Sequence, residues 1–468
     1  MNTSLLHPDT HTEFDRKLIA ALPATGPRYT SYPTADRFHS GFSETNYLHA
    51  LSQRRAEADG KPLSLYVHIP FCNTICYYCG CNKIITKDTS RADAYINYLA
   101  KELELLAPHL NGRQPLAQLH FGGGTPTFLN DEQLGRVFEL IHRHFQLLPD
   151  GEYSIEIDPR KVSRATVLQL GKLGFNRMSV GIQDFDPQVQ AAVNRIQSFD
   201  ETKEVMDAAR EAGFKSVSVD LIYGLPHQSA DSIQTTIATV LALNPDRLAL
   251  YHYAHLPHIF KPQRRIDTAA VPDSEEKLDM LQYCVQTLTE SGYVFIGMDH
   301  FAKPDDELAI ALREGKLQRN FQGYSTYADC DLVAIGVSSI GKIGNSYIQN
   351  ERDIEAYYQA LDKGRLPVMR GYRLNEDDTL RRGLIQDLMC RFTLDFSDYE
   401  TESDTPFAQY FADELADLQQ LADLGLLKLH PHGLTVTPKG RFLIRNIAMV
   451  FDYHLRHKET AAKYSQTV

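Results

Sequence analysis

A short pattern that recurs in the middle of this 468-residue chain limits the folds open to it. A glycine is followed at once by an aromatic residue, as in Gly174-Phe175, Gly213-Phe214 and Gly292-Tyr293, and an apolar segment begins shortly after. Each copy is typical of a helix that ends in a left-handed glycine and leads into a β-strand, because glycine adopts positive φ without steric cost. Asn244, which also tolerates positive φ, takes the place of glycine before the segment 247–254.

Helix signals fill the intervals between these apolar segments. Apolar residues recur at helical spacing over 92–106, and two pairs, Ser198 with Glu201 and Asp273 with Glu276, have the spacing of a capping box. Strands that alternate with helices in this way predict a parallel β/α sheet or barrel. The predicted strands are 63–69, 115–121, 152–158, 176–183, 216–223 and 247–254, with a further strand at 293–300.

Alternation along the predicted strands places polar side chains together on one face. In the first strand Leu65 and Val67 share one face, and Tyr66 points to the other. The apolar face should meet the surrounding helices, and a barrel filled only by packing would carry bulky branched residues on its inner face. The pattern favours a ligand cavity, and the alternative is a set of buried polar groups that hydrogen-bond to one another. The polar set comprises Tyr66, His68, Glu156, Gln183 and Asp220.

Three cysteines, Cys72, Cys76 and Cys79, follow the first predicted strand with C-x3-C-x2-C spacing. Three close thiolates can hold three irons of a [4Fe–4S] cluster, and the fourth iron then stays open to a small molecule. A structural zinc site with Cys81 as its fourth ligand is one alternative, but zinc-binding cysteines usually form two well-separated pairs. An electron-transfer cluster with four cysteines is another, but Cys81 lies too close to Cys79 to serve easily. The spacing favours the open cluster.

Three glycines, 122–124, follow the second predicted strand in the run His120-Phe121-Gly122-Gly123-Gly124-Thr125. Such glycines let the backbone approach a ligand closely and present free N–H groups. The run is not a Walker P-loop, because no Lys-Ser/Thr follows it at the required place. A tight turn between strand and helix is the alternative, but it would need fewer glycines.

Composition narrows the functional classes. The formal net charge of −12 argues against a nucleic-acid partner, because phosphate binding requires basic surface. No segment approaches the roughly 18 consecutive apolar residues of a membrane span, and residues 1–18 lack the apolar core of a secretory signal. Seven cysteines without a disulfide framework suit a reducing compartment, so we expect a cytoplasmic protein.

The cysteine spacing, with the aromatic Tyr78 before the last cysteine, resembles the radical S-adenosylmethionine (SAM) superfamily. The glycine run is similar to the motif that hydrogen-bonds the SAM amino group, although many members have Gly-Gly-Glu where this chain has Gly-Gly-Gly-Thr. Longer segments resemble one family within it, the oxygen-independent coproporphyrinogen III oxidases (dehydrogenases) of haem biosynthesis. From about residue 20 to the C-terminus, these segments are 27–34, 65–72, 79–83, 121–127, 154–160, 181–185, 220–226, 253–257, 297–301 and 320–324.

The resemblance implies an oxidoreductase of porphyrin and haem biosynthesis. In that family a reduced [4Fe–4S] cluster cleaves SAM to methionine and a 5′-deoxyadenosyl radical, which removes a β-hydrogen from a propionate of coproporphyrinogen III. Loss of CO2 and one electron leaves a vinyl group, and two such decarboxylations give protoporphyrinogen IX. The alternative is a haem-binding radical SAM relative that acts as a haem chaperone. Such a relative is expected to lack Cys81 and segments 27–34 and 320–324, all present here.

The resemblance also implies a partial (β/α)6 barrel that binds two SAM molecules, and family residues carry over where the motifs match. Cys72, Cys76 and Cys79 would ligate the cluster. The residues expected to line the cluster-bound SAM are Tyr66, Gly123, Glu156 and Ile340. The residues expected to line the second SAM are Tyr78, Gly124, Thr125, Gln183, Arg195, Asp220 and Ala254.

The implied substrate carries four propionates, so basic side chains should surround it. The arginine candidates are Arg28, Arg264, Arg265 and Arg319, and Tyr32 and Cys81 are further substrate-side candidates. Each has an ordinary alternative as a surface arginine, part of a packed tail or a small buried thiol. No residue is assigned a catalytic role.

Three consecutive segments are predicted along the chain. They are an N-terminal arm at 1–60, the radical SAM barrel at 61–365 and a smaller, mostly helical C-terminal domain at 366–468. In the last segment, helices at 376–396, 407–425 and 438–456 accompany a β-hairpin at 426–437. We further expect a monomer that receives electrons from a low-potential donor such as a flavodoxin.

Overall fold

The computed structural model describes residues 12–23, 25–57, 61–110, 112–327, 330–399 and 405–457. The chain divides into two compact units, each assembled from separated stretches of sequence. Unit 1 comprises Met1–Arg37, Leu281–Ala328 and Leu374–Val468, and unit 2 comprises Phe38–Met280 and Asp329–Arg373. The predicted division into three consecutive segments stays a prediction.

The core of unit 2 is a sheet whose strands run in the order β16-β15-β14-β13-β1-β4-β5-β6-β7-β8. The neighbours from β13 to β8 pair in parallel, and those from β13 to β16 pair antiparallel. The six predicted strands are confirmed as β1 (Leu63–Ile69), β4 (Gln114–Gly123), β5 (Phe145–Ile157), β6 (Arg177–Gln183), β7 (Ser216–Tyr223) and β8 (Arg247–His252). The remaining strands are β13 (Asp331–Ile335), β14 (Ile340–Ile343), β15 (Ser346–Asn350) and β16 (Val368–Arg373).

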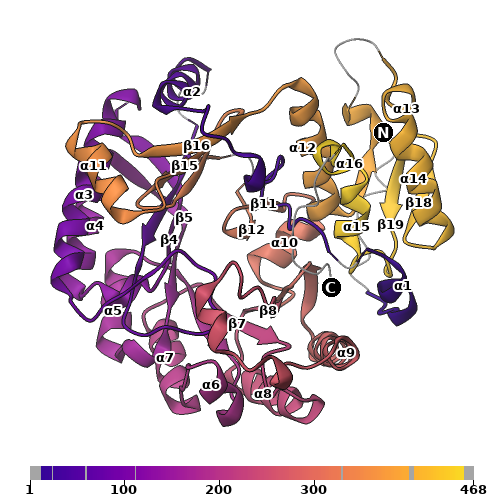
Figure 1. Cartoon of the computed structure of the whole chain (residues 1–468), viewed down its shortest axis with the longest axis horizontal. Coiled ribbons are helices and arrows are strands. Elements are labelled where there is room, and N and C mark those ends of the chain that lie inside the picture. Colours follow the sequence, from indigo (N-terminus) through magenta and orange to yellow (C-terminus); the bar gives the residue numbers. More distant parts are fainter. Residues whose placement is uncertain are drawn as a thin grey trace. The chain divides into compact units, whose positions relative to one another are not determined.

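Helices connect the parallel strands of unit 2, as a β/α fold requires. Figure 1 shows α3, α4, α5 and α7 on the outer side of the strands β4 and β5. The helices of this unit include α2 (Glu44–Glu57), α3 (Ser90–Leu106), α4 (Asp131–His144), α5 (Arg164–Leu173), α6 (Pro187–Ala192), α7 (Phe199–Glu211), α8 (Ala230–Leu243) and α11 (Ile354–Asp362). The predicted α/β class is therefore confirmed.

The recurring helix ends of the sequence have the predicted backbone. Gly174, Gly213 and Gly292 have φ values of 109°, 82° and 91°, and Asn244 has φ 53°. A left-handed residue at these positions lets the last helical carbonyls find N–H donors while the chain turns toward the next strand. Ser198 and Glu201 form the predicted capping box.

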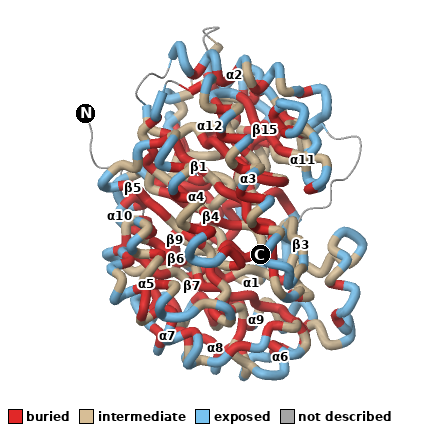
Figure 2. The backbone as a smooth tube through the Cα atoms, turned by 90° about the vertical axis from the view of Figure 1, so that its left-hand side faces the viewer, coloured by how far each residue is buried: buried red, intermediate tan, exposed pale blue. Residues whose placement is uncertain are grey.

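The two faces of the sheet differ as predicted. Leu65 and Val67 are completely buried, whereas Tyr66 and Glu156 are only half-buried. Figure 2 shows the strands β1 and β4 mostly in the buried class, with exposed residues on the outer loops. The apolar side chains therefore pack toward the helices, and the polar set lies on the other face.

The predicted strand at 293–300 is wrong as a single strand. The chain there forms two antiparallel strands of unit 1, β9 (Val294–Gly297) and β10 (His300–Ala302). Gly297 has φ 151° and Met298 has φ 50°, and these positive values reverse the chain between the two strands.

The C-terminal part of unit 1 confirms the hairpin but corrects all three predicted helices, at 376–396, 407–425 and 438–456. The hairpin consists of β18 (Leu427–His430) and β19 (Gly433–Val436), and β17 (Thr393–Asp395) pairs with β19. Helix α12 (Glu376–Arg391) stops short of residue 396 because Phe392 is left-handed, with φ 60°. The predicted helix 438–456 is two short helices, α15 (Ile444–Met449) and α16 (Tyr453–Arg456), because Asp452 begins a new helix as its N-cap. Between residues 407 and 425 lie α13 (Phe407–Tyr410) and α14 (Ala412–Asp423).

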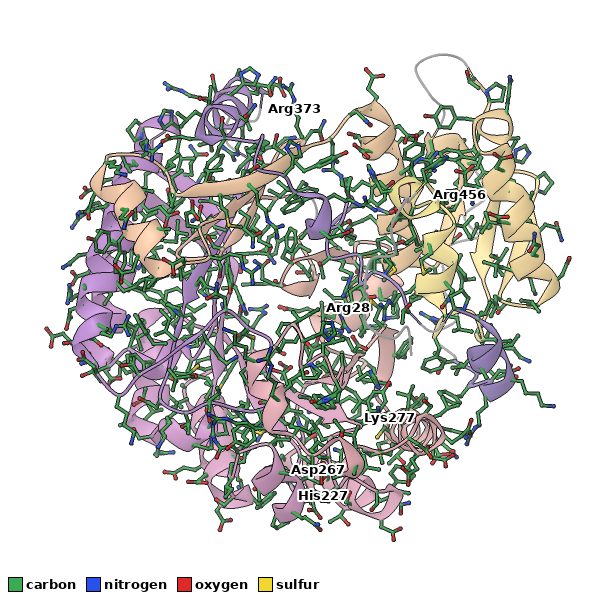
Figure 3. All side chains as sticks on the ribbon, viewed as in Figure 1. Arg28, His227, Asp267, Lys277, Arg373 and Arg456 are labelled. Atoms are coloured by element: carbon green, nitrogen blue, oxygen red, sulfur yellow. The ribbon has the colours of Figure 1, made fainter. Side chains whose placement is uncertain are left out.

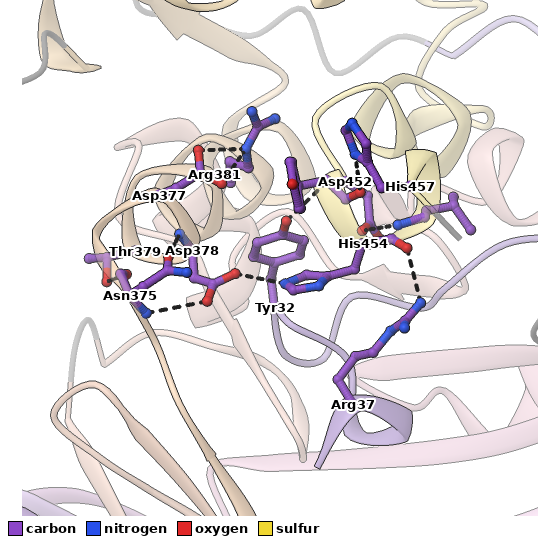
Figure 4. Close-up of polar contacts among 12 residues, drawn as sticks. Tyr32, Arg37, Asn375, Asp377, Asp378, Thr379, Arg381, Asp452, His454 and His457 are labelled. Carbon is purple, nitrogen blue, oxygen red and sulfur yellow. Dashed lines mark hydrogen bonds and ion pairs between the residues drawn. The ribbon is translucent and has the colours of Figure 1, made fainter. Parts of the chain in front are cut away.

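The N-terminal arm was predicted as residues 1–60, but only its part up to Arg37 belongs to the same unit as this C-terminal part. The Tyr29 hydroxyl donates to Asp452 at 3.0 Å, and the backbone N–H of Tyr453 donates to the Tyr32 hydroxyl at 3.1 Å. Arg37 donates to the carbonyl of His454 at 3.0 Å, as Figure 4 shows. Three residues of the arm are thus tied to the last described helix of the chain.

Among the helices that the structure describes, none is both long and apolar enough to cross a membrane.

A buried carboxylate in unit 2 holds the turn between β13 and β14. Glu102 of α3 is 1% exposed and accepts hydrogen bonds from the backbone N–H of Gly336 at 2.8 Å, from Asn350 at 2.6 Å and from the Tyr357 hydroxyl at 2.6 Å. Burial raises the pKa of Glu102 to about 7, although these three donors oppose the shift. One side chain therefore joins α3, the turn, β15 and α11.

Replacing Glu102 with leucine should destabilise the protein strongly, because three buried donors would lose their acceptor. We expect Glu102→Leu to lower the free energy of unfolding by at least about 3 kcal/mol, and Glu102→Gln by about 1 kcal/mol, since glutamine keeps one acceptor oxygen. Thermal unfolding of the purified variants measures both. Equal losses in the two variants would contradict a role for these hydrogen bonds.

Candidate metal and cofactor site

The predicted cluster ligands lie on a loop that starts and ends on paired strands at the carboxyl end of β1. Cys72 lies in β2 (Phe71–Cys72), which pairs in parallel with β3 (Ile84–Ile85) beyond the loop. Cys72 and Cys76 are each 8% exposed, Cys79 is half-buried and Cys81 is exposed. The pairing of β2 with β3 closes the loop at its base.

Hydrogen-bond donors surround the buried sulfurs. Thr125 lies 3.5 Å from the sulfur of Cys72, and Arg195 Nη1 lies 3.5 Å from the sulfur of Cys76. A second guanidinium, that of Arg160, lies 3.7 Å from Cys76 Sγ. Donors and cations stabilise the thiolate form, which is the form that binds metal.

The cysteines influence one another electrostatically. Burial raises the pKa of Cys72 to about 11, and the charges of Cys79 and Cys76 add to this shift. A hydrogen bond from the Cys81 thiol lowers the pKa of Cys79 to about 6, against the effect of burial, and the Lys83 ammonium also lowers it. Cys81 therefore lies beside the triad, with its own pKa raised.

The donor set of the loop fits an iron–sulfur cluster. In the described part of the chain, no three His, Cys, Asp or Glu side chains meet closely enough to hold a single metal ion. The three thiolates of a [4Fe–4S] site bind three different irons, so they need not meet at one point. Two arginines and a threonine hydroxyl at the sulfurs also suit an anionic cluster.

The glycine run brings the ends of β1 and β4 together. The N–H of Gly124 donates to the carbonyl of Ile69 at 2.8 Å, and the N–H of Thr125 donates to the carbonyl of Phe71 at 2.8 Å. A Cβ on Gly124 would lie 2.7 Å from the carbonyl of Phe71, and one on Gly123 would lie 2.5 Å from the His68 ring. Gly123 has φ 113°, so glycine is required there by both space and conformation.

Three of the predicted polar residues, Tyr66, His68 and Glu156, are linked through His120 on the inner face of the sheet. The N–H of Gly123 donates to Glu156 at 3.1 Å, and His120 Nε2 lies 3.3 Å from the same carboxylate. The Tyr66 ring stacks on His120, with centroids 5.8 Å apart, and its hydroxyl lies 3.0 Å from His68 Nδ1. Burial works to raise the pKa of Glu156, but His120 and the Gly123 N–H lower it overall. Glu156 is thus an ionised carboxylate with a side chain that is 44% exposed.

Gln183, Arg195 and Asp220 lie around Gly181 of β6: a Cβ on Gly181 would be 2.9 Å from both Arg195 Nη2 and Gln183 Nε2, and Asp220 of β7 is the strand partner of Gly181. Gln183 has φ 69°, an unusual conformation for a residue with a side chain, where the register of β6 on β7 shifts. Arg195 donates to the carbonyl of Gly181 at 2.5 Å. Asp220 accepts from Ser179 at 2.9 Å, and burial raises the pKa of Asp220 to about 6.

Sequence reasoning missed Gln263, which joins two predicted cofactor residues. Its side-chain amide is buried and donates to the carbonyls of Tyr78 at 2.9 Å and Ala254 at 3.1 Å. Its amide oxygen accepts from the N–H of Leu256 at 2.5 Å. No motif marks Gln263, which lies in a short 3-10 helix (Lys261–Arg265) and acts on backbone atoms. Only the glutamine itself, within a basic stretch, could have attracted notice.

The other predicted residues divide between the units. Ile340 begins β14 in unit 2, after the turn that Glu102 holds. The guanidinium of Arg265 lies over the Tyr77 ring at 5.3 Å, and Arg264 is exposed. The candidates Arg28, Tyr32 and Arg319 lie in unit 1, and Cys81 lies in unit 2.

Known proteins resemble the chain over almost its whole length. Residues 66–240 match the radical SAM superfamily, and residues 374–443 match the HemN C-terminal domain. A protein named oxygen-independent coproporphyrinogen III oxidase from Pseudomonas aeruginosa is 51% identical, over 94% of this chain and 96% of its own length. A protein of the same name from Escherichia coli is 48% identical, over 97% and 99%. The solved structure described as "Coproporphyrinogen III oxidase (HemN) from Escherichia coli is a Radical SAM enzyme" superposes with a TM-score of 0.90, at 48% identity, over 95% of this chain and 100% of that chain.

Gly123 and Gly174 offer a matched pair of glycine substitutions. Both have strongly positive φ, 113° and 109°, but a Cβ on Gly174 would meet nothing within 4 Å. We expect Gly174→Ala to cost about 1–2 kcal/mol of stability through backbone strain alone. Gly123→Ala should cost more and displace His68, and thermal unfolding together with tyrosine fluorescence would report both effects. Equal behaviour of the two variants would contradict the close contact with His68.

Proposed function

Because the chain belongs to the family of oxygen-independent coproporphyrinogen III oxidases, in the radical SAM superfamily, we propose that it acts on coproporphyrinogen III. The reaction is the oxidative decarboxylation of two propionates to vinyl groups, which gives protoporphyrinogen IX. The observation that carries the proposal is that the similarity spans the cysteine loop, the sheet and the C-terminal domain alike. The haem-chaperone alternative is not favoured, since the matching relatives are named as oxidases.

The superfamily uses a [4Fe–4S] cluster and SAM, and the residues of unit 2 fit them. Together these cofactors supply the radical that removes hydrogen from the propionate β-carbon. Cys72, Cys76 and Cys79 would hold the cluster. Arg195 and Arg160, beside Cys76, would offset the negative charge of the thiolates.

The protein would orient SAM rather than exchange protons with it. The ionised Glu156 carboxylate, with the Gly123 backbone and Tyr66 beside it, can accept hydrogen bonds from an ammonium group or a ribose diol. Ile340 would add apolar contact on the same side. These four residues would position the SAM molecule bound to the cluster.

A second SAM molecule is part of the proposal. Asp220 and Gln183 come from the neighbouring strands β7 and β6 and can bind ribose hydroxyls, and Tyr78 can stack on a base. Arg195 offers a guanidinium fork to a carboxylate. The other expected contacts of this second site are Gly124, Thr125 and Ala254.

Further features complete the proposed role. The proposed cluster would have to be reduced, so the protein would need a low-potential electron donor such as a flavodoxin. We also propose that the protein works as a monomer. Seven cysteines without a disulfide among those described suit a cytoplasmic location. We propose that residues 61–365 form the catalytic segment, which lies in sequence between the N-terminal arm and the C-terminal domain.

An anaerobic assay of the reconstituted protein tests the reaction. With SAM, a reductant and coproporphyrinogen III, we expect protoporphyrinogen and 5′-deoxyadenosine to rise together, with about two deoxyadenosines per porphyrin because each decarboxylation removes one hydrogen. Cys76→Ser should abolish both products, and Cys330→Ser, outside the triad, should keep them. Chromatography quantifies both. Deoxyadenosine without a new porphyrin would contradict the substrate assignment.

The number of bound SAM molecules can be counted directly. Equilibrium dialysis of the reconstituted protein with labelled SAM should give two molecules per chain. We expect Asp220→Ala to bind one, because the variant loses a carboxylate of the second site, and the exposed Asp231→Ala to bind two. A single SAM molecule bound to the unsubstituted protein would contradict the second site.

A further inference from the structure

The buried side chain of Gln263 joins two segments of unit 2 that lie far apart in the sequence. Gln263 is 2% exposed and lies in the 3-10 helix Lys261–Arg265. Its Nε2 donates to the carbonyl of Tyr78 at 2.9 Å and to the carbonyl of Ala254 at 3.1 Å. Its Oε1 accepts from the N–H of Leu256 at 2.5 Å. Both N–H groups of the amide are therefore used, and each is directed at a different segment of backbone.

The two carbonyls belong to residues of the proposed second SAM site. Tyr78 lies in the cysteine loop, one residue before Cys79, and Ala254 follows the end of β8. In the proposed function Tyr78 stacks on a base, and Ala254 lines the same site. Because one nitrogen donates to both carbonyls, it fixes the separation between these two stretches of backbone. Gln263 thereby controls how far the cysteine loop lies from the end of β8.

The backbone of Tyr78 is held on both sides. The N–H of Tyr77 donates to the carbonyl of Val193 at 2.9 Å, and the carbonyl of Cys79 accepts from Lys83 Nζ at 2.9 Å. The carbonyl of Tyr78 lies between these contacts and accepts the hydrogen bond described above. The direction of a side chain follows from its backbone angles, so this hydrogen bond helps to aim the Tyr78 ring.

Side-chain packing holds the helix that carries Gln263 against the cysteine loop. A Cβ on Gly80 would lie 2.9 Å from the Phe260 ring, and the guanidinium of Arg265 lies over the Tyr77 ring at 5.3 Å. Packing of this kind sets no direction for a carbonyl, whereas a hydrogen bond does. The packing therefore brings the helix to the loop, and the amide of Gln263 determines how the two backbones are oriented.

The segment that carries Gln263 is anchored at its other end as well. Asp267, labelled in Figure 3, accepts from the N–H of Ala269 at 3.0 Å. The N–H of His227, also labelled there, donates to the carbonyl of Ala270 at 2.7 Å. The segment is thus fixed to the turn after β7 before any ligand binds, which reduces the entropy lost on binding.

We propose that Gln263 is a positioning residue of the second SAM site, because it holds the carbonyls of Tyr78 and Ala254 in the arrangement that this SAM molecule requires. The proposal rests on the proposed function, which includes a second SAM molecule. Glutamine suits the task because one amide supplies two donors and an acceptor. The residues proposed for the cluster-bound SAM include neither Tyr78 nor Ala254, so the effect of Gln263 is specific to the second site.

The alternative is that Gln263 only closes its own loop. Its hydrogen bonds to Ala254 and Leu256 are local, and closing the loop would need nothing more. That alternative predicts that substitutions lower stability and leave the affinity for both SAM molecules unchanged. The hydrogen bond to Tyr78, 185 residues earlier in the chain, is the contact that loop closure does not require.

The test compares Gln263→Met with Gln228→Met in the reconstituted protein. Gln228 is 5% exposed, and its Nε2 donates to Asp184 at 2.5 Å and to the carbonyl of Ile222 at 2.8 Å. Its Oε1 accepts from the N–H of Leu225 at 2.9 Å. Each variant loses three hydrogen bonds of a buried amide, but no partner of Gln228 is expected to bind SAM. We expect the two variants to lose similar stability in thermal unfolding.

Equilibrium dialysis with labelled SAM measures the second site directly. We expect Gln228→Met to bind two molecules as the unsubstituted protein does. In Gln263→Met the Kd of the second molecule should rise at least about tenfold, the effect of one lost buried hydrogen bond. The electron paramagnetic resonance signal of the reduced cluster should still respond to SAM in Gln263→Met, because the first site is intact.

A second variant covers the case in which Gln263→Met fails to fold. Gln263→Glu has nearly the shape of the original side chain and keeps an acceptor for the N–H of Leu256. It cannot donate to both carbonyls, so we expect it to raise the same Kd in the same direction.

The outcomes distinguish this proposal from the proposed function. An unchanged Kd for the second SAM in Gln263→Met and Gln263→Glu would overturn the positioning role and leave the proposed function intact. Equal weakening in Gln263→Met and Gln228→Met, or loss of the cluster response in Gln263→Met, would also overturn it, because the effect would then not be specific to the second site. A single SAM molecule bound to the unsubstituted protein would overturn the second site and the positioning role together.

Discussion

The compensation of negative charge at the end of β1 is the constraint on which unit 2 depends. Three cysteines and two carboxylates, Glu156 and Asp158, lie at neighbouring strand ends, and Cys72, Cys76 and Asp158 are largely buried. Arg160 pairs with Asp158 at 2.6 Å and lies near Cys76, and Arg195 contacts Cys76 and Asp158 together. Two guanidinium groups thereby tie the cysteine loop to the ends of β5 and β6. The polar inner face is stable because each anion has a donor of its own.

The local sequence was enough to predict the strands, the helix ends and the polar face. Strand alternation distinguishes the two faces, because Leu65 and Tyr66 must point in opposite directions whatever the rest of the chain does. Left-handed glycines such as Gly174 mark helix ends, because other residues avoid that conformation. The predicted cluster ligands and the residues expected to bind SAM came from motifs and stay predictions. In the structure Gly123 donates to Glu156, and Tyr66 stacks on His120.

The remaining features depend on contacts between residues far apart in the chain. Gln263 acts on the backbone of Tyr78, which lies 185 residues earlier, so no local pattern identifies it. The chain reversal at Met298 depends on a single positive φ angle within an otherwise apolar segment. The break in the last predicted helix depends on the N-cap residue Asp452. The sequence also could not predict which segments make up unit 1, because the arm and the C-terminal helices meet only through contacts such as that of Tyr29 with Asp452.

Units 1 and 2 handle buried charge in opposite ways. At the cysteine loop the sulfurs of Cys72 and Cys76 and the carboxylate of Asp158 have donors from side chains, namely Thr125, Arg195 and Arg160. In unit 1 the arginines donate instead to backbone carbonyls, Arg445 to that of Pro27 and Arg319 to that of Arg28. A buried guanidinium is stable only where such acceptors replace water, so these arginines fasten the segment 26–28 at the same time as their own charge is solvated.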